Sequence, residues 1–266
     1  YLDATAPVCG TWSPTSSPWR SSAAAYTFTL SGSTDAHSGI NTAGGSCTTG
    51  TANGNTCTVT ISDNVGRTRA CTSPVNRIDT TPPVLTYSTN GTGWLTQGRA
   101  TPSYHDDESG IQSGSAKYVW SSATSGVTPS YDMPNGTRRD YSSNTQTVRL
   151  HGRVCNNAGL CTQNYTHAFK VDSVAPTAGS ITCGRWYVSN TSYRYYIWFG
   201  ADAYSGVNYI TFYANGATRT IYASNKTYFT STSLISSFSV TSRNVYDMAG
   251  NRFQPANITV SCTPLN

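Results

Sequence analysis

Residues 79–83 read Asp-Thr-Thr-Pro-Pro, residues 106–111 read Asp-Asp-Glu-Ser-Gly-Ile, and residues 156–159 read Asn-Asn-Ala-Gly. Proline after a short polar stretch fixes an extended backbone. The Ser-Gly and Ala-Gly pairs that follow an acidic or amide side chain favour tight turns. Short strand-like segments lie between the motifs, for example residues 117–120 and 147–150. This stretch therefore predicts a small β-sandwich whose strands are joined by tight turns.

The same three motifs occur three times, in the same order. They begin at residues 3, 35 and 63, at 79, 106 and 156, and at 172, 202 and 247. Internal repetition at this spacing predicts tandem domains. We place them at residues 1–78, 79–171 and 172–266. The chain opens near a first motif and stops where a fourth repeat would begin, which favours a piece of a longer array.

The first predicted domain departs from the other two. Its second and third motifs, at residues 35 and 63, are much closer together than those at 106 and 156. We therefore expect it to lack a strand pair or a long connection. It also holds four of the eight cysteines, and a smaller core benefits most from covalent cross-links.

The composition supports an all-β protein and excludes several classes of function. Charged residues make up 11% of the chain, against roughly 25% in ordinary soluble proteins. Strong helix formers are scarce, whereas Ser, Thr, Asn, Gly and Tyr are abundant. The net charge of +5 is scattered, so we expect no nucleic-acid partner. No apolar stretch approaches the length of a membrane span, so we expect none in this chain.

In combination, the three motifs resemble those of tandem bacterial immunoglobulin-like domains of secreted and cell-surface proteins. The resemblance covers essentially the whole chain and implies an all-β array of three disulfide-bonded immunoglobulin-like sandwiches. It also implies the roles of stalks, adhesins and envelope-associated proteins, in which such domains space or bind rather than catalyse. It names no ligand.

Eight cysteines, an even number, favour full pairing in an oxidising compartment outside the cell. We expect Cys155 to bond Cys161 across the third-motif turn. A bond from Cys183 to Cys262 would join the first and last strands of the third domain. In the first domain we favour Cys9 with Cys71 and Cys47 with Cys57, although four cysteines allow three connectivities.

Calcium is the one cofactor that the motifs suggest. In an immunoglobulin-like sandwich the domain entry, the loop after the second strand and the last hairpin turn share one pole. That arrangement would gather two oxygen-rich sets suited to calcium, namely Asp79, Asp106, Asp107 and Glu108 near Asn156, and Asp172, Asp202 and Asp247. The alternative is that each aspartate only caps its own turn. The amide at residue 156 and the positive net charge weaken the calcium hypothesis.

Catalysis has little support in the sequence, and we expect no catalytic residues. A general acid and base need two positioned carboxylates with separated pKa values, and Glu108 is the single glutamate. The four histidines sit in unrelated contexts, at residues 37, 105, 151 and 167. Six Asn-x-Ser/Thr sequences are candidate glycosylation sites, at Asn90, Asn135, Asn164, Asn190, Asn225 and Asn257.

Two classes of function fit these features. The first is an extracellular adhesin or stalk, which would contact glycans, surface proteins or other copies of itself. The second is the repeating subunit of an extracellular filament or surface layer, and a remote third is the accessory array of a secreted enzyme. The aromatic runs 186–187 and 193–196 would serve as stacking platforms, or would simply pair across a sheet.

Overall fold

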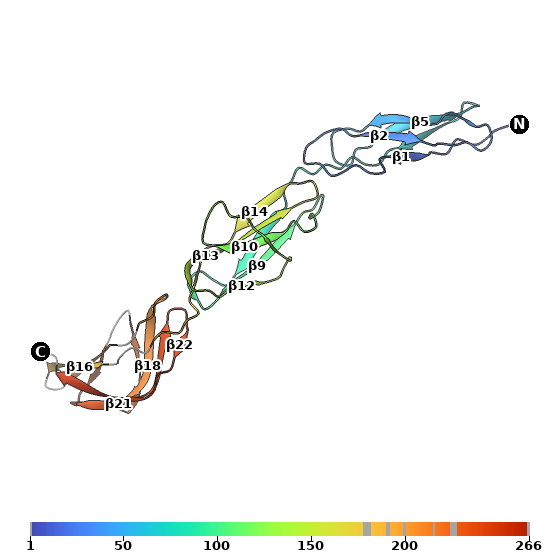
Figure 1. Cartoon of the computed structure of the whole chain (residues 1–266). Helices are drawn as coiled ribbons and strands as arrows, with labels where there is room; N and C mark the ends of the chain where they lie inside the picture. Colours follow the sequence, from blue (N-terminus) through green and yellow to red (C-terminus); the bar gives the residue numbers. More distant parts are fainter. Residues whose placement is uncertain are drawn as a thin grey trace.

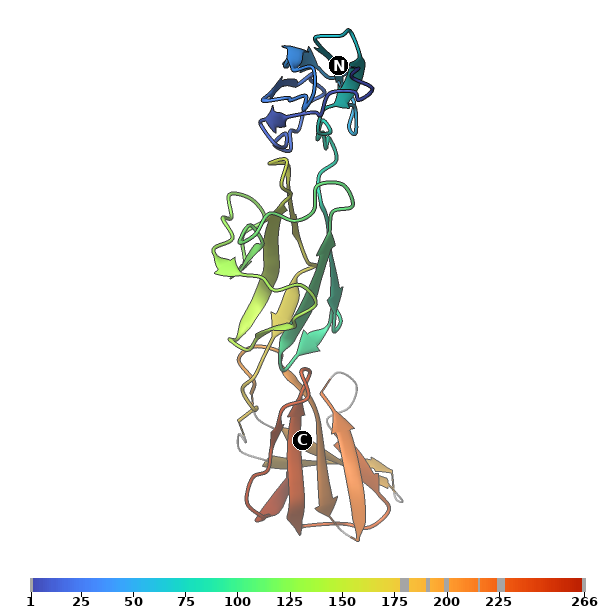
Figure 2. The same ribbon diagram turned by 90° about the vertical axis from the view of Figure 1, so that its right-hand side faces the viewer.

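The computed structural model describes residues 2–177, 182–189, 192–198, 201–214, 216–223 and 228–264. Their regular secondary structure consists of strands alone, so the predicted all-β fold class is confirmed. The strands fall into three consecutive groups along an elongated molecule, with the N- and C-terminal ends at opposite extremes (Figures 1 and 2). Within the described segments no helix is long and apolar enough to cross a membrane.

The first group is a small sandwich. Its strands are β1 (Thr11–Ser13), β2 (Thr27–Ser31), β3 (Ile40–Thr42), β4 (Gly45–Thr48), β5 (Thr58–Asp63) and β6 (Thr68–Thr72). They form two three-stranded sheets, ordered β1-β2-β4 and β3-β5-β6. The core comprises Leu30 from the first sheet and Val59, Ile61 and Cys71 from the second. Strand β2 alternates exposed and buried positions, which is the pattern of a strand with one face in a core.

The second group has nine strands. They are β7 (Val84–Thr89), β8 (Trp94–Leu95), β9 (Gly98–His105), β10 (Lys117–Ser121), β11 (Tyr131–Asp132), β12 (Arg139–Tyr141), β13 (Thr145–Cys155), β14 (Cys161–Tyr165) and β15 (Phe169–Val171). A β12-β9-β7 sheet packs on a six-stranded sheet centred on β13. Ala100, Leu150 and Phe169 join the two sheets in one core. The first group is smaller than this one, as we expected from its motif spacing.

The third group forms one continuous eight-stranded sheet. Its strands are β16 (Thr182–Ser189), β17 (Ser192–Trp198), β18 (Val207–Ala214), β19 (Ala217–Tyr222), β20 (Tyr228–Ser231), β21 (Ser237–Asp247), β22 (Arg252–Phe253) and β23 (Ile258–Pro264). The long β21 pairs with β23 through its first half and with β18 through its second half. Phe212, Phe238 and Val240 form part of the core inside the fold of this sheet.

Each junction between groups passes through the aspartate of a first motif. The backbone N–H of Asp79 donates to the carbonyl of Arg20 over 2.9 Å, and that of Asp172 donates to the carbonyl of Leu95 over 2.9 Å. In both cases the acceptor belongs to the preceding group of strands. The described pairings join no strands of different groups. The domain boundaries at residues 78 and 171 remain predictions.

Candidate functional site

The first-motif aspartates are held by the same two hydrogen bonds in all three repeats. Oδ1 accepts the N–H two residues later, over 2.9 Å at Asp3, 2.9 Å at Asp79 and 3.0 Å at Asp172. Oδ2 accepts the backbone N–H of the second-motif serine over 3.1, 3.2 and 3.1 Å, in the same order. The linker carboxylate is thereby attached to the sandwich that follows it.

The second-motif aspartates close their own turns. Oδ1 of Asp35, Asp106 and Asp202 accepts the N–H of the glycine four residues later, over 3.1, 2.8 and 2.8 Å. These glycines have φ angles of +80°, +73° and +80°, which side chains with a Cβ rarely adopt. The turn that we predicted is therefore present. It uses Oδ1 of each aspartate, so Oδ2 takes no part in the turn.

The third motif supplies one fully buried side chain in each repeat: Asp63, Asn156 and Asp247 are 0%, 0% and 1% exposed. Each lies at or directly after the end of a strand, β5, β13 or β21. In all three, Oδ1 accepts the N–H four residues later over 2.8, 2.9 and 2.8 Å. In the second repeat the other side-chain atom, Nδ2 of Asn156, bonds to the other two motifs, whereas in the third repeat Oδ2 of Asp247 accepts a hydrogen bond from Nδ2 of Asn251 over 2.8 Å.

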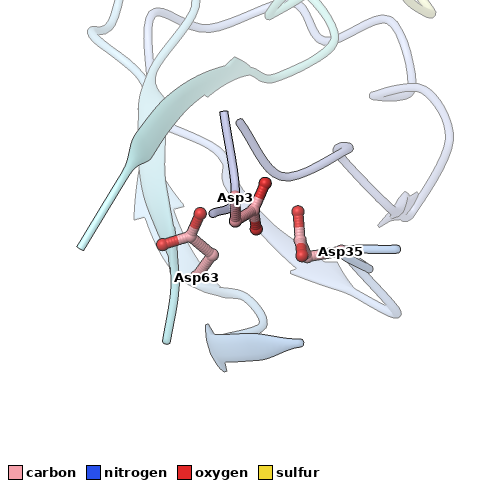
Figure 3. A group of neighbouring side chains, drawn as sticks. All are labelled: Asp3, Asp35 and Asp63. Carbon is pink, nitrogen blue, oxygen red and sulfur yellow. The ribbon is translucent and has the colours of Figure 1, made fainter. Parts of the chain in front are cut away.

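Repeats one and three bring three carboxylates together. Carboxylate oxygens of Asp3, Asp35 and Asp63 lie within 4.8 Å of one another, and the same holds for Asp172, Asp202 and Asp247. Figure 3 shows the first of these clusters, with the carboxylate of Asp3 between the other two in that view. Oxygen atoms at this separation are suited to a hard cation such as calcium.

Repeat two has an amide in the corresponding place. Nδ2 of Asn156 lies 2.9 Å from Oδ2 of Asp79, 3.1 Å from Oδ2 of Asp106 and 2.9 Å from the carbonyl of Thr81. An amide is a donor that carries no charge, so it satisfies both carboxylates without adding a third negative charge. The side chain of Ser109 also donates to Asp79.

The electrostatics of the clusters follow from this difference. In repeat three, burial and the nearby Asp172 raise the pKa of Asp247 above its ordinary value of 3.8. Two unit charges at 4.8 Å repel by about 3 kcal/mol at an effective dielectric constant of ~20, so ionising this cluster is costly without a counter-charge. In repeat two, burial opposes ionisation of Asp79, but hydrogen bonds from Ser109 and Thr81 outweigh it and lower its pKa.

The structure thus joins most of the predicted ligand residues and leaves others out. Asp172, Asp202 and Asp247 meet as predicted, and Asp79 and Asp106 meet at Asn156. Asp107 and Glu108 are exposed and line a shallow surface pocket with Thr81 and Pro82. A hydrogen bond to Asp79 raises the pKa of Glu108. The aspartate turn caps, which we kept as the alternative, are present, and calcium binding remains a prediction.

Sequence reasoning missed the cluster of Asp3, Asp35 and Asp63 as a candidate site. The signal was available, because these residues occupy the same three motif positions as the predicted set in repeat three. The prediction considered junctions between domains, whereas this cluster lies where the chain enters the first sandwich.

The eight cysteines form four disulfides in the structure. The pairs are Cys9 with Cys71, Cys47 with Cys57, Cys155 with Cys161, and Cys183 with Cys262, the pairs that we favoured from the sequence. Cys155 and Cys161 are direct partners in the β13–β14 ladder. Cys183 and Cys262 are partners in the parallel pairing of β16 with β23.

The histidines form no catalytic arrangement among the described contacts. His37 Nδ1 lies 3.2 Å from the hydroxyl of Thr5, and His167 Nε2 lies 2.6 Å from the carbonyl of Gly91. His151 is buried against the ring of Tyr165, with ring centroids 5.1 Å apart. That no residue is catalytic remains a prediction.

The candidate glycosylation sites are exposed wherever the structure describes them, at Asn90, Asn135, Asn164 and Asn257. Asn190 and Asn225 lie outside the described residues. In the aromatic runs, Tyr187 is 55% exposed and pairs with Tyr193 across the β16–β17 ladder. The other aromatic side chains of these runs lie outside the described part.

The chain matches no family model and no curated protein. Among solved structures, it is similar to domains A168-A170 from titin, with 11% identity, a TM-score of 0.40, and coverage of 98% of this chain and 100% of that one. The three N-terminal domains of the bacteriophage RB49 highly immunogenic outer capsid protein share 8% identity, with a TM-score of 0.40 and coverage of 98% and 100%. A Ca²⁺-stabilized adhesin of an Antarctic bacterium shares 15% identity, with a TM-score of 0.36 and coverage of 99% and 75%.

The fold class of this chain, an all-β array, rests on its own strands. Identities of 15% or less and TM-scores of 0.40 or less assign it no function.

Proposed function

We propose that this chain is a non-catalytic rod of immunoglobulin-like domains that acts outside the cell as an adhesin or stalk. The observation that carries the proposal is the double attachment of the junction aspartates. The backbone of Asp172 bonds to Leu95 in the preceding strands, while its carboxylate bonds to Val174 and Ser205 in the following repeat. Nδ2 of Asn251 also donates to the carbonyl of Asp172 over 2.7 Å. A linker held on both sides resists bending.

The first junction supports the same function. Asp79 bonds through its backbone to Arg20 and through its carboxylate to Ser109 and Asn156. Ile78, directly before it, is only 6% exposed, so the linker is packed rather than free. A stiff junction keeps the two ends of a chain apart, which is what a stalk requires.

The covalent framework supports an extracellular location. All eight cysteines are paired, and disulfides persist in oxidising compartments. Low charge and a surface rich in Ser, Thr and Tyr suit contacts with glycans, surface proteins or further copies of the chain. These partners are part of the proposal.

Negative-stain electron microscopy of the non-reduced chain, combined with small-angle X-ray scattering, tests it. We expect discrete straight rods whose maximum dimension equals the summed lengths of the sandwiches arranged end to end. Asp172→Ala should broaden the distribution of bend angles at the second junction, whereas the matched surface variant Asp107→Ala should leave it unchanged. Regular fibres or sheets would instead make the chain a filament or surface-layer subunit, and randomly bent particles of the unmodified chain would refute the rod.

A further inference from the structure

The cluster at the entry to the first sandwich has an aspartate, Asp63, where the corresponding group of the second repeat has Asn156. We infer that Asp3, Asp35 and Asp63 form a calcium-binding site, and that the amide of Asn156 takes the place of this ion in the second repeat. The inference concerns residues 3, 35 and 63, which lie outside the sets predicted from the sequence. It is independent of the proposed role as a stalk.

The first observation is an unpartnered buried atom. Asp63 is 0% exposed, and its Oδ2 has no hydrogen-bond partner among the described residues. Its Oδ1, by contrast, accepts the N–H groups of Val65 and Arg67 over 3.0 and 2.8 Å. A buried carboxylate oxygen without a partner is costly, since it has lost water and gained nothing in exchange. Such an atom calls for a ligand.

The second observation shows where that atom points. Asp63 and Asn156 hold the same motif position, and Oδ1 of each accepts the N–H four residues later. Oδ2 of Asp63 therefore corresponds to Nδ2 of Asn156. Nδ2 of Asn156 donates to the Oδ2 atoms of Asp79 and Asp106, whose equivalents in the first repeat are Asp3 and Asp35. By this equivalence the unpartnered oxygen lies on the side of the two further carboxylates, whose oxygens come within 4.8 Å of an oxygen of Asp63.

The third observation is the lack of a protein counter-charge. The two ion pairs of the described residues are Lys117 with Asp132 and Arg138 with Asp140, far from this cluster in the chain. Arg67 is exposed and its Nε donates to the backbone carbonyl of Asp3, not to a carboxylate. His37 contacts the hydroxyl of Thr5. Among the described residues no cationic side chain forms an ion pair with these three carboxylates, so a bound cation would offset their mutual repulsion.

The donor set selects the class of cation. Asp3, Asp35 and Asp63 contribute oxygen alone, and the cluster holds no thiol. Hard oxygen donors favour calcium or magnesium over zinc and copper. Calcium accepts six to eight oxygens at about 2.3–2.6 Å in adaptable geometry, whereas magnesium demands a near-ideal octahedron at about 2.0–2.1 Å. Carboxylates already fixed by loop hydrogen bonds suit the more adaptable ion.

Calcium titration of the full chain, after exhaustive removal of metal, tests the site by counting bound ions with isothermal titration calorimetry and equilibrium dialysis. Asp63→Asn should bind one calcium fewer per chain than the unmodified protein. It should remain folded in chelator, as judged by near-ultraviolet circular dichroism, because an amide at residue 63 donates to Asp3 and Asp35 as Asn156 does to its own partners. Magnesium chloride is the control titrant and should bind at least tenfold more weakly.

The reverse substitution, in the second repeat, distinguishes loss of the binding site from loss of folding. Asn156→Asp recreates in the second repeat the carboxylate set of the first, and should gain one calcium per chain together with a calcium-dependent rise in Tm. Asp107→Asn, an exposed change next to Asp106, should alter neither quantity. An Asp63→Asn chain that binds as many ions as the unmodified protein would overturn the inference, and so would an Asn156→Asp chain that gains none.

Discussion

The side-chain amide of Asn156 donates to the Oδ2 atom of Asp79 over 2.9 Å, and both residues are buried, at 0% and 1% exposed. The two residues lie 77 positions apart in the chain. This bond joins the linker that enters the second sandwich to the turn that follows its longest strand. It also shows how a buried carboxylate is satisfied when no cation is involved.

Removing that amide should be costly. Asn156→Ala leaves the carboxylates of Asp79 and Asp106 without their shared donor, so we expect a loss of about 2–4 kcal/mol in the free energy of unfolding. Asn157→Ala is the matched control, because the neighbouring asparagine is exposed and donates once, to the carbonyl of Ser109. It should cost under about 1 kcal/mol. Urea denaturation of both variants measures the difference, and equal losses would contradict this account.

The third repeat should respond in the opposite way to an amide. Asp202→Asn removes one of three facing carboxylates while keeping an oxygen for the N–H groups of Tyr204 and Gly206, and burial raises the pKa of the facing Asp247. In the presence of chelator we expect the variant to unfold at a temperature at least a few degrees above that of the unmodified protein, with a gain of about 1 kcal/mol. Differential scanning calorimetry checks the shift. A variant less stable in chelator than the unmodified chain would show that the third carboxylate does not destabilise the repeat.

The two later disulfides should differ in their contributions. Cys183 and Cys262 are 79 residues apart, whereas Cys155 and Cys161 are 6 apart. Because a cross-link restrains the unfolded chain more when it closes a longer loop, replacing the first pair with alanine should cost about 4 kcal/mol and the second about 2 kcal/mol. Guanidinium unfolding of the two double variants gives both values. The ranking fails if the short-loop variant loses more stability.

Acid should destabilise the second repeat through His151. This side chain is 2% exposed, and burial together with the nearby Arg149 lowers its pKa below the ordinary 6.5. A lowered pKa means that stability is present above pH 6.5 and is lost as the pH falls through the folded-state value. His151→Phe keeps an aromatic ring beside Tyr165 but cannot be protonated. Its Tm should therefore fall less between neutral pH and pH 5, and parallel curves would exclude His151 as the cause.

Local sequence was sufficient for the elements of the fold. Residues 117–120 and 147–150 were predicted as strands, and they lie within β10 and β13. The Ser-Gly turns followed from the aspartate and glycine of the second motif, since Gly39 and its equivalents adopt positive φ and donate to that aspartate. These features depend on neighbours within a few residues, and that is the range over which side-chain chemistry can be interpreted without a structure.

The repeat pattern also located most of the candidate site, because equivalent motif positions occupy equivalent places in each sandwich. Asp172, Asp202 and Asp247 were predicted to converge on this basis, and the structure brings them together. The pattern could not exclude Asp107, which stands next to Asp106 in the sequence. Only the turn conformation directs one carboxylate inward and leaves the other exposed.

What the sequence by itself determined was the all-β class, the order of the motifs and the set of residues able to meet at one pole of each sandwich. Tertiary structure alone decided which atoms meet. Asn156 Nδ2 reaches partners 77 and 50 residues away, whereas Asp63 Oδ2, at the equivalent position, has no hydrogen-bond partner among the described residues. The physical reason is that a buried polar atom is satisfied by whatever the packed chain places within about 3 Å of it, and that distance depends on folding across the whole domain.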